Sequence, residues 1–178
     1  MFQWQWGLMG GDSLLALLLE EAYDRRDRGS PSPRVAEAQS GARAGTSATA
    51  VMAIVSKKVF DTEHKRAKLG DVLAISRYAG THKGLEPLSA GGDLYLVTAR
   101  PGDVLWLVGV MRQPQKQDNA WVAEPNTVPI TDISSLRGTI RFTSGKGISQ
   151  KKGALSRSLQ TPRELSAEDI VQLTEALG

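Results

Sequence analysis

The chain contains no cysteine and only two histidines among its 178 residues. Without cysteine it forms no disulfide, thiolate zinc site, iron–sulfur cluster or cysteine nucleophile. Two histidines, His64 and His82, are too few for one chain to build a histidine-rich metal site. We therefore predict no metal and no cofactor. The lack of cysteine is consistent with a cytoplasmic protein.

Long apolar runs and a large excess of one charge are missing as well. The apolar stretch Leu14–Leu19 is far shorter than the about 20 residues that cross a bilayer. No basic residue precedes Arg25, whereas a secretory signal needs a basic region ahead of its apolar stretch. We predict neither a signal peptide nor a membrane span. Lys and Arg number 22 against 19 Asp and Glu, so the distribution of charge carries more information than its total.

The first 51 residues differ in composition from the rest. Asp12 or Ser13 caps a predicted helix over about residues 13–27, and its Leu14–Leu19 stripe either docks a protein partner or packs on the chain's own domain. The Gly-, Ser-, Ala- and Pro-rich stretch that follows predicts a flexible linker. Met52 is a candidate native start. We expect an N-terminal helix and linker over 1–51 and one β-rich globular domain over 52–178.

Hydrophobic patterning predicts the elements of that domain. The strongest signal is GGDLYLVTARPGDVLWLVGVM, residues 91–111, where two apolar runs flank a turn at Arg100–Asp103. It predicts a β-hairpin, central in its sheet because both faces of each strand are apolar. Further strands are predicted over residues 51–60, 71–78, 120–124 and 138–144. Residues 61–70 indicate a short helix or a loop, and helical turns are predicted near Leu85 and over 131–138.

The clearest helix is at the C-terminus. Ser166 is its expected cap, and Asp169 completes an approximate capping box. Ile170, Leu173 and Leu177 form the stripe that we expect to be buried. Hairpins dominate the element order. It predicts an α+β fold with a small mixed or antiparallel sheet, curled or barrel-like, and a C-terminal helix.

Basic residues are concentrated between Ile133 and Arg163, where no acidic residue occurs; they are Arg137, Arg141, Lys146, Lys151, Lys152, Arg157 and Arg163. A second acid-free stretch, 73–85, adds further cations. If the fold brings the two stretches together, we expect one positive face that attracts phosphates. Backbone amides of the glycine-rich loop SGKGISQKKG would donate hydrogen bonds to a phosphate, and an aromatic ring would stack on a base. The rings considered are Tyr78, Trp106 and Trp121. The predicted nucleic-acid-binding residues are Arg77, His82, Lys83, Arg141, Lys146, Lys151, Lys152 and Arg157.

A different interpretation is that these cations only keep an exposed loop soluble, with nearby acids such as Asp61, Glu63 or Glu124 compensating them. Catalytic patterns are missing: the phosphate-loop pattern fails after Lys146, and G-x-G-x-x-G fails at Gln150. The acids beside His64 are more typical of a solvated loop than of a catalytic cluster. His82 is either a base or phosphate ligand or closes a turn by hydrogen bonding. We favour a protein that is not an enzyme.

Four stretches, THKGLEPLSAGGDLYLVTARP, LWLVGVM, EPNTVPITDISSL and SLQTPRELSAEDI, resemble a family of small uncharacterised bacterial proteins. The similarity covers about residues 75–178 and supports a start near Met52. GGDLYLVTARPGDVLWLVGVM is also distantly similar to the core of PUA-like barrels of the EVE and ASCH types. That resemblance implies a β-barrel with a nucleic-acid or modified-base pocket beside the hairpin. The family's other marks are missing around the motif, so no pocket residue is carried over.

Two functions are therefore expected. The first is a nucleic-acid-binding, barrel-like module that uses the basic glycine-rich loop. The second is a protein-interaction or accessory domain without catalytic activity, in which the N-terminal Leu- and Trp-containing segment or a sheet edge is the contact.

Overall fold

The computed structural model describes residues 49–178. The helix predicted over residues 13–27, its Leu14–Leu19 stripe and the linker lie outside the described residues. Across the part of the chain that is described, no helix combines the length and the apolar character that crossing a membrane requires.

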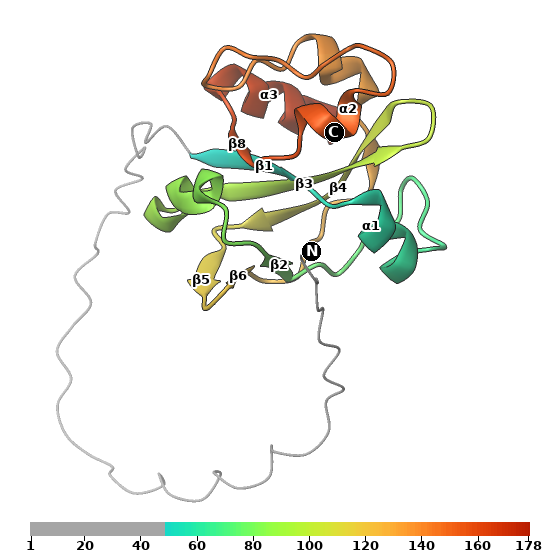
Figure 1. The fold of residues 1–178 in the computed structure, drawn as a ribbon. Coiled ribbons are helices and arrows are strands. Elements are labelled where there is room, and N and C mark those ends of the chain that lie inside the picture. Colours follow the sequence, from blue (N-terminus) through green and yellow to red (C-terminus); the bar gives the residue numbers. More distant parts are fainter. Residues whose placement is uncertain (1–48) are drawn as a thin grey trace, which may run out of the picture. The chain divides into compact units, whose positions relative to one another are not determined.

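A mixed five-stranded sheet lies at the centre of the described chain (Figure 1). The order of its strands is β7-β4-β3-β1-β8. The β1–β3 pair is parallel, and the other three strand pairs of this sheet are antiparallel. A second sheet has the order β2-β6-β5. The strands are β1 (Ala50–Ile54), β2 (Arg77–Ala79), β3 (Asp93–Arg100), β4 (Val104–Arg112), β5 (Gln115–Gln117), β6 (Ala120–Val122), β7 (Thr131–Asp132) and β8 (Arg163–Glu164).

The predicted α+β class, with a mixed sheet and a C-terminal helix, is confirmed, but the five-stranded sheet is open and does not close into a barrel. Closure requires the two edge strands to pair with each other. Here β7 and β8 are two residues long each and lie at opposite edges of the sheet. The parallel β1–β3 pair needs a crossover, which the chain makes through α1, β2 and η1.

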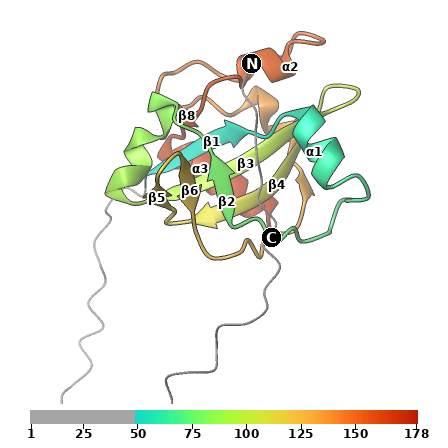
Figure 2. The same ribbon diagram turned by 60° about the horizontal axis from the view of Figure 1, so that its bottom comes forward.

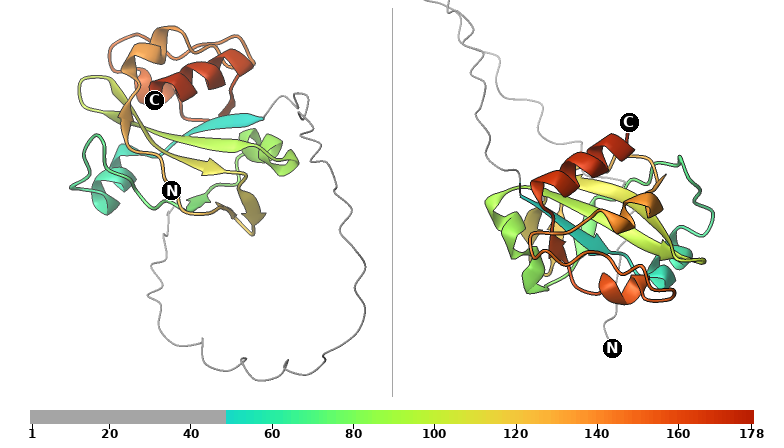
Figure 3. Two further views of the ribbon diagram at one scale, coloured as in Figure 1. Left: turned by 180° about the vertical axis from the view of Figure 1, so that it is seen from behind. Right: turned by 90° about the horizontal axis from the view of Figure 1, so that it is seen from above.

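Helical segments and the second sheet cover the two faces of the central sheet (Figures 1 and 3). The chain after β7, with η2, α2 and α3, covers one face, which Figure 3 shows from above. The other face packs against α1, η1 and the three-stranded sheet. The helices are α1 (Lys57–Glu63), η1 (Lys83–Ala90), η2 (Ser134–Gly138), α2 (Leu155–Ser158) and α3 (Ala167–Ala176).

The β3–β4 hairpin is central, as predicted, because each of its faces packs against a separate layer. Tyr95 and Val97 of β3 point into the core under α2 and α3, and Leu94 and Leu96 point into the core on the opposite face. Burying a large apolar side chain contributes about 1.5–3 kcal/mol, so this strand anchors both layers. The tip of the hairpin is the predicted turn, with Gly102 at φ +83°.

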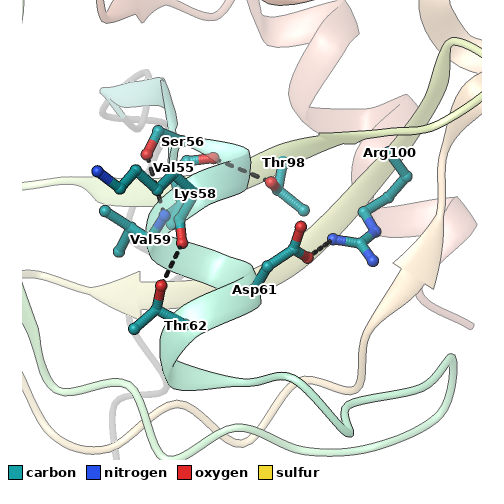
Figure 4. A network of polar contacts seen from close by, with 8 residues as sticks. All are labelled: Val55, Ser56, Lys58, Val59, Asp61, Thr62, Thr98 and Arg100. Carbon is teal, nitrogen blue, oxygen red and sulfur yellow. Dashed lines mark hydrogen bonds and ion pairs between the residues drawn. The ribbon is translucent and has the colours of Figure 1, made fainter.

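A short polar network joins the end of β1 to the start of α1 (Figure 4). Ser56 caps α1, because its side-chain oxygen accepts a hydrogen bond of 3.3 Å from the Val59 amide. The buried hydroxyl of Thr98 in β3 donates to the Val55 carbonyl at 2.9 Å. The chain therefore leaves the sheet at a fixed point and turns directly into the helix.

Two strand predictions are corrected by this structure. The strand predicted over 51–60 ends at Ile54, because the serine cap starts α1 within the predicted range. The strand predicted over 71–78 is reduced to an isolated bridge at Val72 and to β2. A side-chain amide from Asn126 binds the backbone there and takes the place of a neighbouring strand. The helical turns predicted near Leu85 and over 131–138 are confirmed as η1 and η2, which are 3₁₀ helices.

The strand predicted over 138–144 is also wrong, since that stretch is irregular. The Asp169 carboxylate accepts hydrogen bonds from the Arg141 amide at 2.9 Å and from the Phe142 amide at 2.8 Å. These amides are therefore not free to pair with a strand, and Phe142 adopts φ +52°. Asp169 also completes the predicted capping box of α3 with Ser166, which is confirmed.

Beginning the chain at Met52 instead of at residue 46 is expected to lower the free energy of unfolding by about 2–4 kcal/mol. Val51 is fully buried in β1, and Ala50 accepts a hydrogen bond of 2.8 Å from the Leu165 amide. Urea unfolding of the 46–178 and 52–178 variants measures the difference. Equal stability of the two variants would contradict the role of Ala50 and Val51 in the core.

Candidate nucleic-acid interface

Arg137 holds the backbone of the acid-free segment instead of facing solvent. It donates hydrogen bonds of 2.7 Å to the Asp103 carbonyl and to the Ser149 carbonyl. The Asp103 carboxylate in turn accepts from the Gly153 amide at 2.9 and 3.1 Å. The glycine-rich loop is therefore tied at two points to the tip of the β3–β4 hairpin. The guanidinium group suits this task because its rigid fork donates to two carbonyls at once.

Arg163 fixes the beginning of the same loop. It donates to the Ser144 hydroxyl at 2.9 Å and to the Lys146 carbonyl. Its guanidinium carbon lies 3.8 Å from the centroid of the Phe142 ring, a cation–π contact. Partial burial lowers the pKa of Arg163, and the negative charge of Asp169 acts in the opposite direction. Arg163 therefore organises the loop and is not available as a surface cation.

The other five basic residues of the segment are exposed; they are Arg141, Lys146, Lys151, Lys152 and Arg157. Within residues 49–178, none of them forms an ion pair, because the two ion pairs found there are Arg100–Asp61 and Arg112–Asp93. Asp61, one of the acids expected to compensate the loop, is thus engaged elsewhere. Five uncompensated cations on a fixed backbone form what we call the basic segment, residues 141–157.

His82 and Lys83 lie near the end of the basic segment, whereas Arg77 does not. The backbone at Gly84, two residues after His82, approaches Pro162, five residues beyond the segment, so closely that a Cβ on Gly84 would lie 2.4 Å from the Pro162 carbonyl oxygen. Lys83 is exposed. Arg77 is exposed on β2, in the sheet that covers the opposite face from the basic segment. The predicted site residues therefore do not form one continuous group.

The side chain of His82 closes a turn. It caps η1, because its Nδ1 accepts a hydrogen bond of 2.9 Å from the Gly84 amide. The turn-closing interpretation of this histidine is confirmed. His82 also lines a pocket, where its second ring nitrogen is the remaining polar group of the imidazole.

A pocket of about 740 Å³ is lined by residues from the C-terminal end of β1, the start of α1 and η1. Figure 2 shows the ribbon of β1 leading into α1. Its volume is in the range of small-molecule sites. Burial raises the pKa of Tyr78, in its wall, to about 12, so the phenol stays protonated at neutral pH. The apolar lining includes Ile54, Val55, Val59, Leu85 and Pro162. The polar lining includes Ser56, Thr81, His82, Asn119 and Gln160.

The three aromatic rings expected to stack a base are not displayed for that purpose. Tyr78 and Trp121 are buried, with exposed fractions of 6% and 2%. Trp106 is half-buried, and one face of its ring is covered by the Arg100 guanidinium at 5.0 Å from the ring centroid. Arg100 is held there by its ion pair with Asp61. Sequence alone could not reveal this, because the contact joins α1, β3 and β4.

Glu63 and His64 belong to no metal-binding group among the described residues. Burial lowers the pKa of His64 and raises that of Glu63, which favours the neutral form of each. The His64 ring packs against Phe60 with 5.6 Å between ring centroids. Residues 49–178 contain no group of three or more His, Asp or Glu side chains suited to a metal ion.

Sequence reasoning did not assign the residues that shape the basic segment. Arg137 and Arg163 count as cations in the sequence, and only the structure shows that they bind carbonyl oxygens. Asp103 was expected in a turn, but its contact with Gly153 spans 50 residues. The one local signal is the glycine at position 153, whose φ of +73° places its amide toward the hairpin turn.

Comparison with known proteins found no match of this chain to a family model, to a curated protein sequence or to a solved structure.

Proposed function

We propose that this protein binds nucleic acid through the basic segment, residues 141–157, in the cytoplasm. The observation that carries the proposal is the set of five exposed cations without an acidic partner in the described chain. Such cations bind phosphates and release the counterions condensed on them, which gives a favourable free energy at moderate salt. The cytoplasmic location rests on the absence of cysteine.

The fixed backbone of the segment supports this function. Three side chains hold it by hydrogen bonds: Arg163 at Ser144, Arg137 at Ser149, and Asp103 at Gly153. A loop that is already ordered loses little conformational entropy when its lysines contact phosphates. A loop whose lysines only maintain solubility has no need of such anchoring.

The competing proposal, protein interaction through a sheet edge, has less support in the described residues. Both edge strands of the central sheet, β7 and β8, are two residues long, so they present few free backbone groups to another strand. The Leu14–Leu19 stripe lies outside the described residues, and a contact through it stays a prediction.

Replacing Lys146, Lys151 and Lys152 together with alanine is expected to weaken binding to labelled RNA and DNA at least about tenfold. The negative slope of log K against log salt should become shallower by about 3 units, because each lost phosphate contact removes about one unit. Fluorescence anisotropy of the full chain with single- and double-stranded RNA and DNA, over about 50–200 mM salt, measures both quantities.

A matched control removes three exposed lysines outside the basic segment, Lys65, Lys68 and Lys116, and changes the net charge equally. This control should retain the affinity and the slope of the natural sequence. Equal losses in the two triple variants would show that only bulk charge matters. Absence of binding by the natural sequence at the lowest salt would reject the proposed function.

A further inference from the structure

We infer that the nucleic acid bound by the basic segment is double-stranded and is held by its phosphates, without stacking of bases on Phe, Tyr or Trp rings of residues 49–178. This inference rests on the proposed function and specifies its ligand. It follows from which groups the described surface presents and which it does not.

No Phe, Tyr or Trp side chain is exposed in residues 49–178, and the one exposed aromatic ring in this range is the imidazole of His82, whose Nδ1 is engaged by the Gly84 amide. The large apolar side chains that are exposed there are Leu69, Val72 and Val171, and none of these is aromatic. Phe142, the ring within the basic segment, is 2% exposed and lies under the Arg163 guanidinium. Proteins that bind single strands without sequence preference rely on rings on which successive bases stack, each contributing about 1–3 kcal/mol. Within residues 49–178, no exposed Phe, Tyr or Trp ring supplies that contribution.

The charge of a duplex fits the basic segment better than that of a single strand. A duplex carries about one negative charge per 1.7 Å of its axis, and a single strand carries fewer. A duplex is also stiff, so it does not need to be ordered to meet cations on a fixed backbone. A flexible strand loses conformational freedom when it binds, and base stacking normally compensates that loss.

The helices near the segment are unsuited to reading base edges. α2 has four residues, which is too short to act as a recognition helix in a major groove. α3 has ten residues, but Glu168 in its exposed first turn repels phosphates. The contacts that remain go to the phosphate backbone, which carries no sequence information directly. Binding should therefore be nearly independent of sequence.

The test compares duplexes of about 20 base pairs with their separate strands, for DNA and for RNA, using the full chain and fluorescence anisotropy. Duplex should bind at least about tenfold more tightly than either strand at about 50 mM salt. The salt slope should be no steeper than about −4.5, which is −0.9 for each of five cations. Two duplexes of unrelated sequence should agree within about threefold. The DNA and RNA arms show which duplex is preferred.

Single-residue variants connect the result to the segment. Lys152→Ala should make the duplex salt slope shallower by about one unit, whereas Lys116→Ala, at an exposed position of β5, should leave it unchanged. Single strands that bind as tightly as duplex would overturn the inference while the proposed function stands. Absence of binding to every nucleic acid would instead reject the proposed function itself.

Discussion

Replacing Asp169 with alanine is expected to lower the free energy of unfolding by about 4 kcal/mol. The carboxylate is 1% exposed and accepts hydrogen bonds from the amides of Arg141, Phe142 and Ser166 at 2.8–3.0 Å. Hydrogen bonds to a charged group contribute about 1.5–3 kcal/mol each, and their loss leaves buried donors without a partner. The effect is large because one side chain serves two purposes, capping α3 and holding the first two residues of the basic segment.

Urea unfolding of the full chain measures this loss. Glu168→Ala is the matched control, since it removes one exposed carboxylate from the same first turn of α3 and should cost less than about 1 kcal/mol. Asp169→Asn keeps the shape but loses the charge, so it should fall between the two and remain folded if the alanine variant does not. Equal stability of the Asp169→Ala and Glu168→Ala variants would contradict the role of the three hydrogen bonds.

Replacing Asn126 with alanine is expected to cost about 3–4 kcal/mol. The side chain is 4% exposed and makes four hydrogen bonds. Its oxygen accepts from the amides of Val110 and Val128 at 2.9 and 3.0 Å, and its nitrogen donates to the carbonyls of Leu73 and Val128 at 2.9 Å. It thereby joins β4 to two segments that have almost no strand pairing of their own.

The neighbourhood of Asn126 leaves little room for substitution. A Cβ on Gly109 would lie 3.1 Å from Asn126 Cγ, so the glycine in β4 makes space for the amide. Asn126→Asp keeps the size but replaces the donor with a carboxylate that faces two carbonyl oxygens, and it should also destabilise the fold. Thr127→Ala, at an exposed neighbour, is the control and should change stability by less than about 0.5 kcal/mol. Thermal or urea unfolding that ranks Asn126→Ala with this control would refute the assigned role.

The loss of Asp169 should also affect binding indirectly. The amides that it holds belong to Arg141 and Phe142, at the beginning of the basic segment. If that backbone is released, Phe142 no longer holds the Arg163 guanidinium by its cation–π contact. Arg163 then no longer fixes the Lys146 carbonyl, and the loop that carries Lys146 loses its anchor. Under the proposed function, we expect the Asp169→Ala variant to lose nucleic-acid affinity as well as stability.

Local patterns in the sequence determined the hairpin, the C-terminal helix and the short helical turns. In the hairpin, Pro101 and Gly102 favour the turn conformation, and the flanking apolar runs favour burial on both faces of the sheet. In α3, Ser166 and Asp169 are three residues apart and cap the helix through contacts within one turn. Such features depend on neighbours in the chain, which is why the sequence alone predicts them.

Tertiary structure decided the features that depend on distant residues. The carboxylate of Asp169 replaces strand pairing at residues 138–144, and Asn126 does so at Leu73. These contacts join residues 27 and 53 positions apart, and no short pattern encodes them. The same holds for the parallel pairing of β1 with β3 and for the open sheet.

The difference between what the sequence determines and what the tertiary structure decides is clearest in the basic segment. Sequence alone determined that seven cations occur between Ile133 and Arg163 without an acid. Only the tertiary structure decided that Arg137 and Arg163 bind carbonyl oxygens far from them in the chain. The other five are exposed without ion pairs in the described chain, and of these Arg141 donates to the adjacent Ile140 carbonyl. An arginine has the same charge in either role. Its role depends on whether backbone carbonyls come within hydrogen-bond distance, which the fold alone determines.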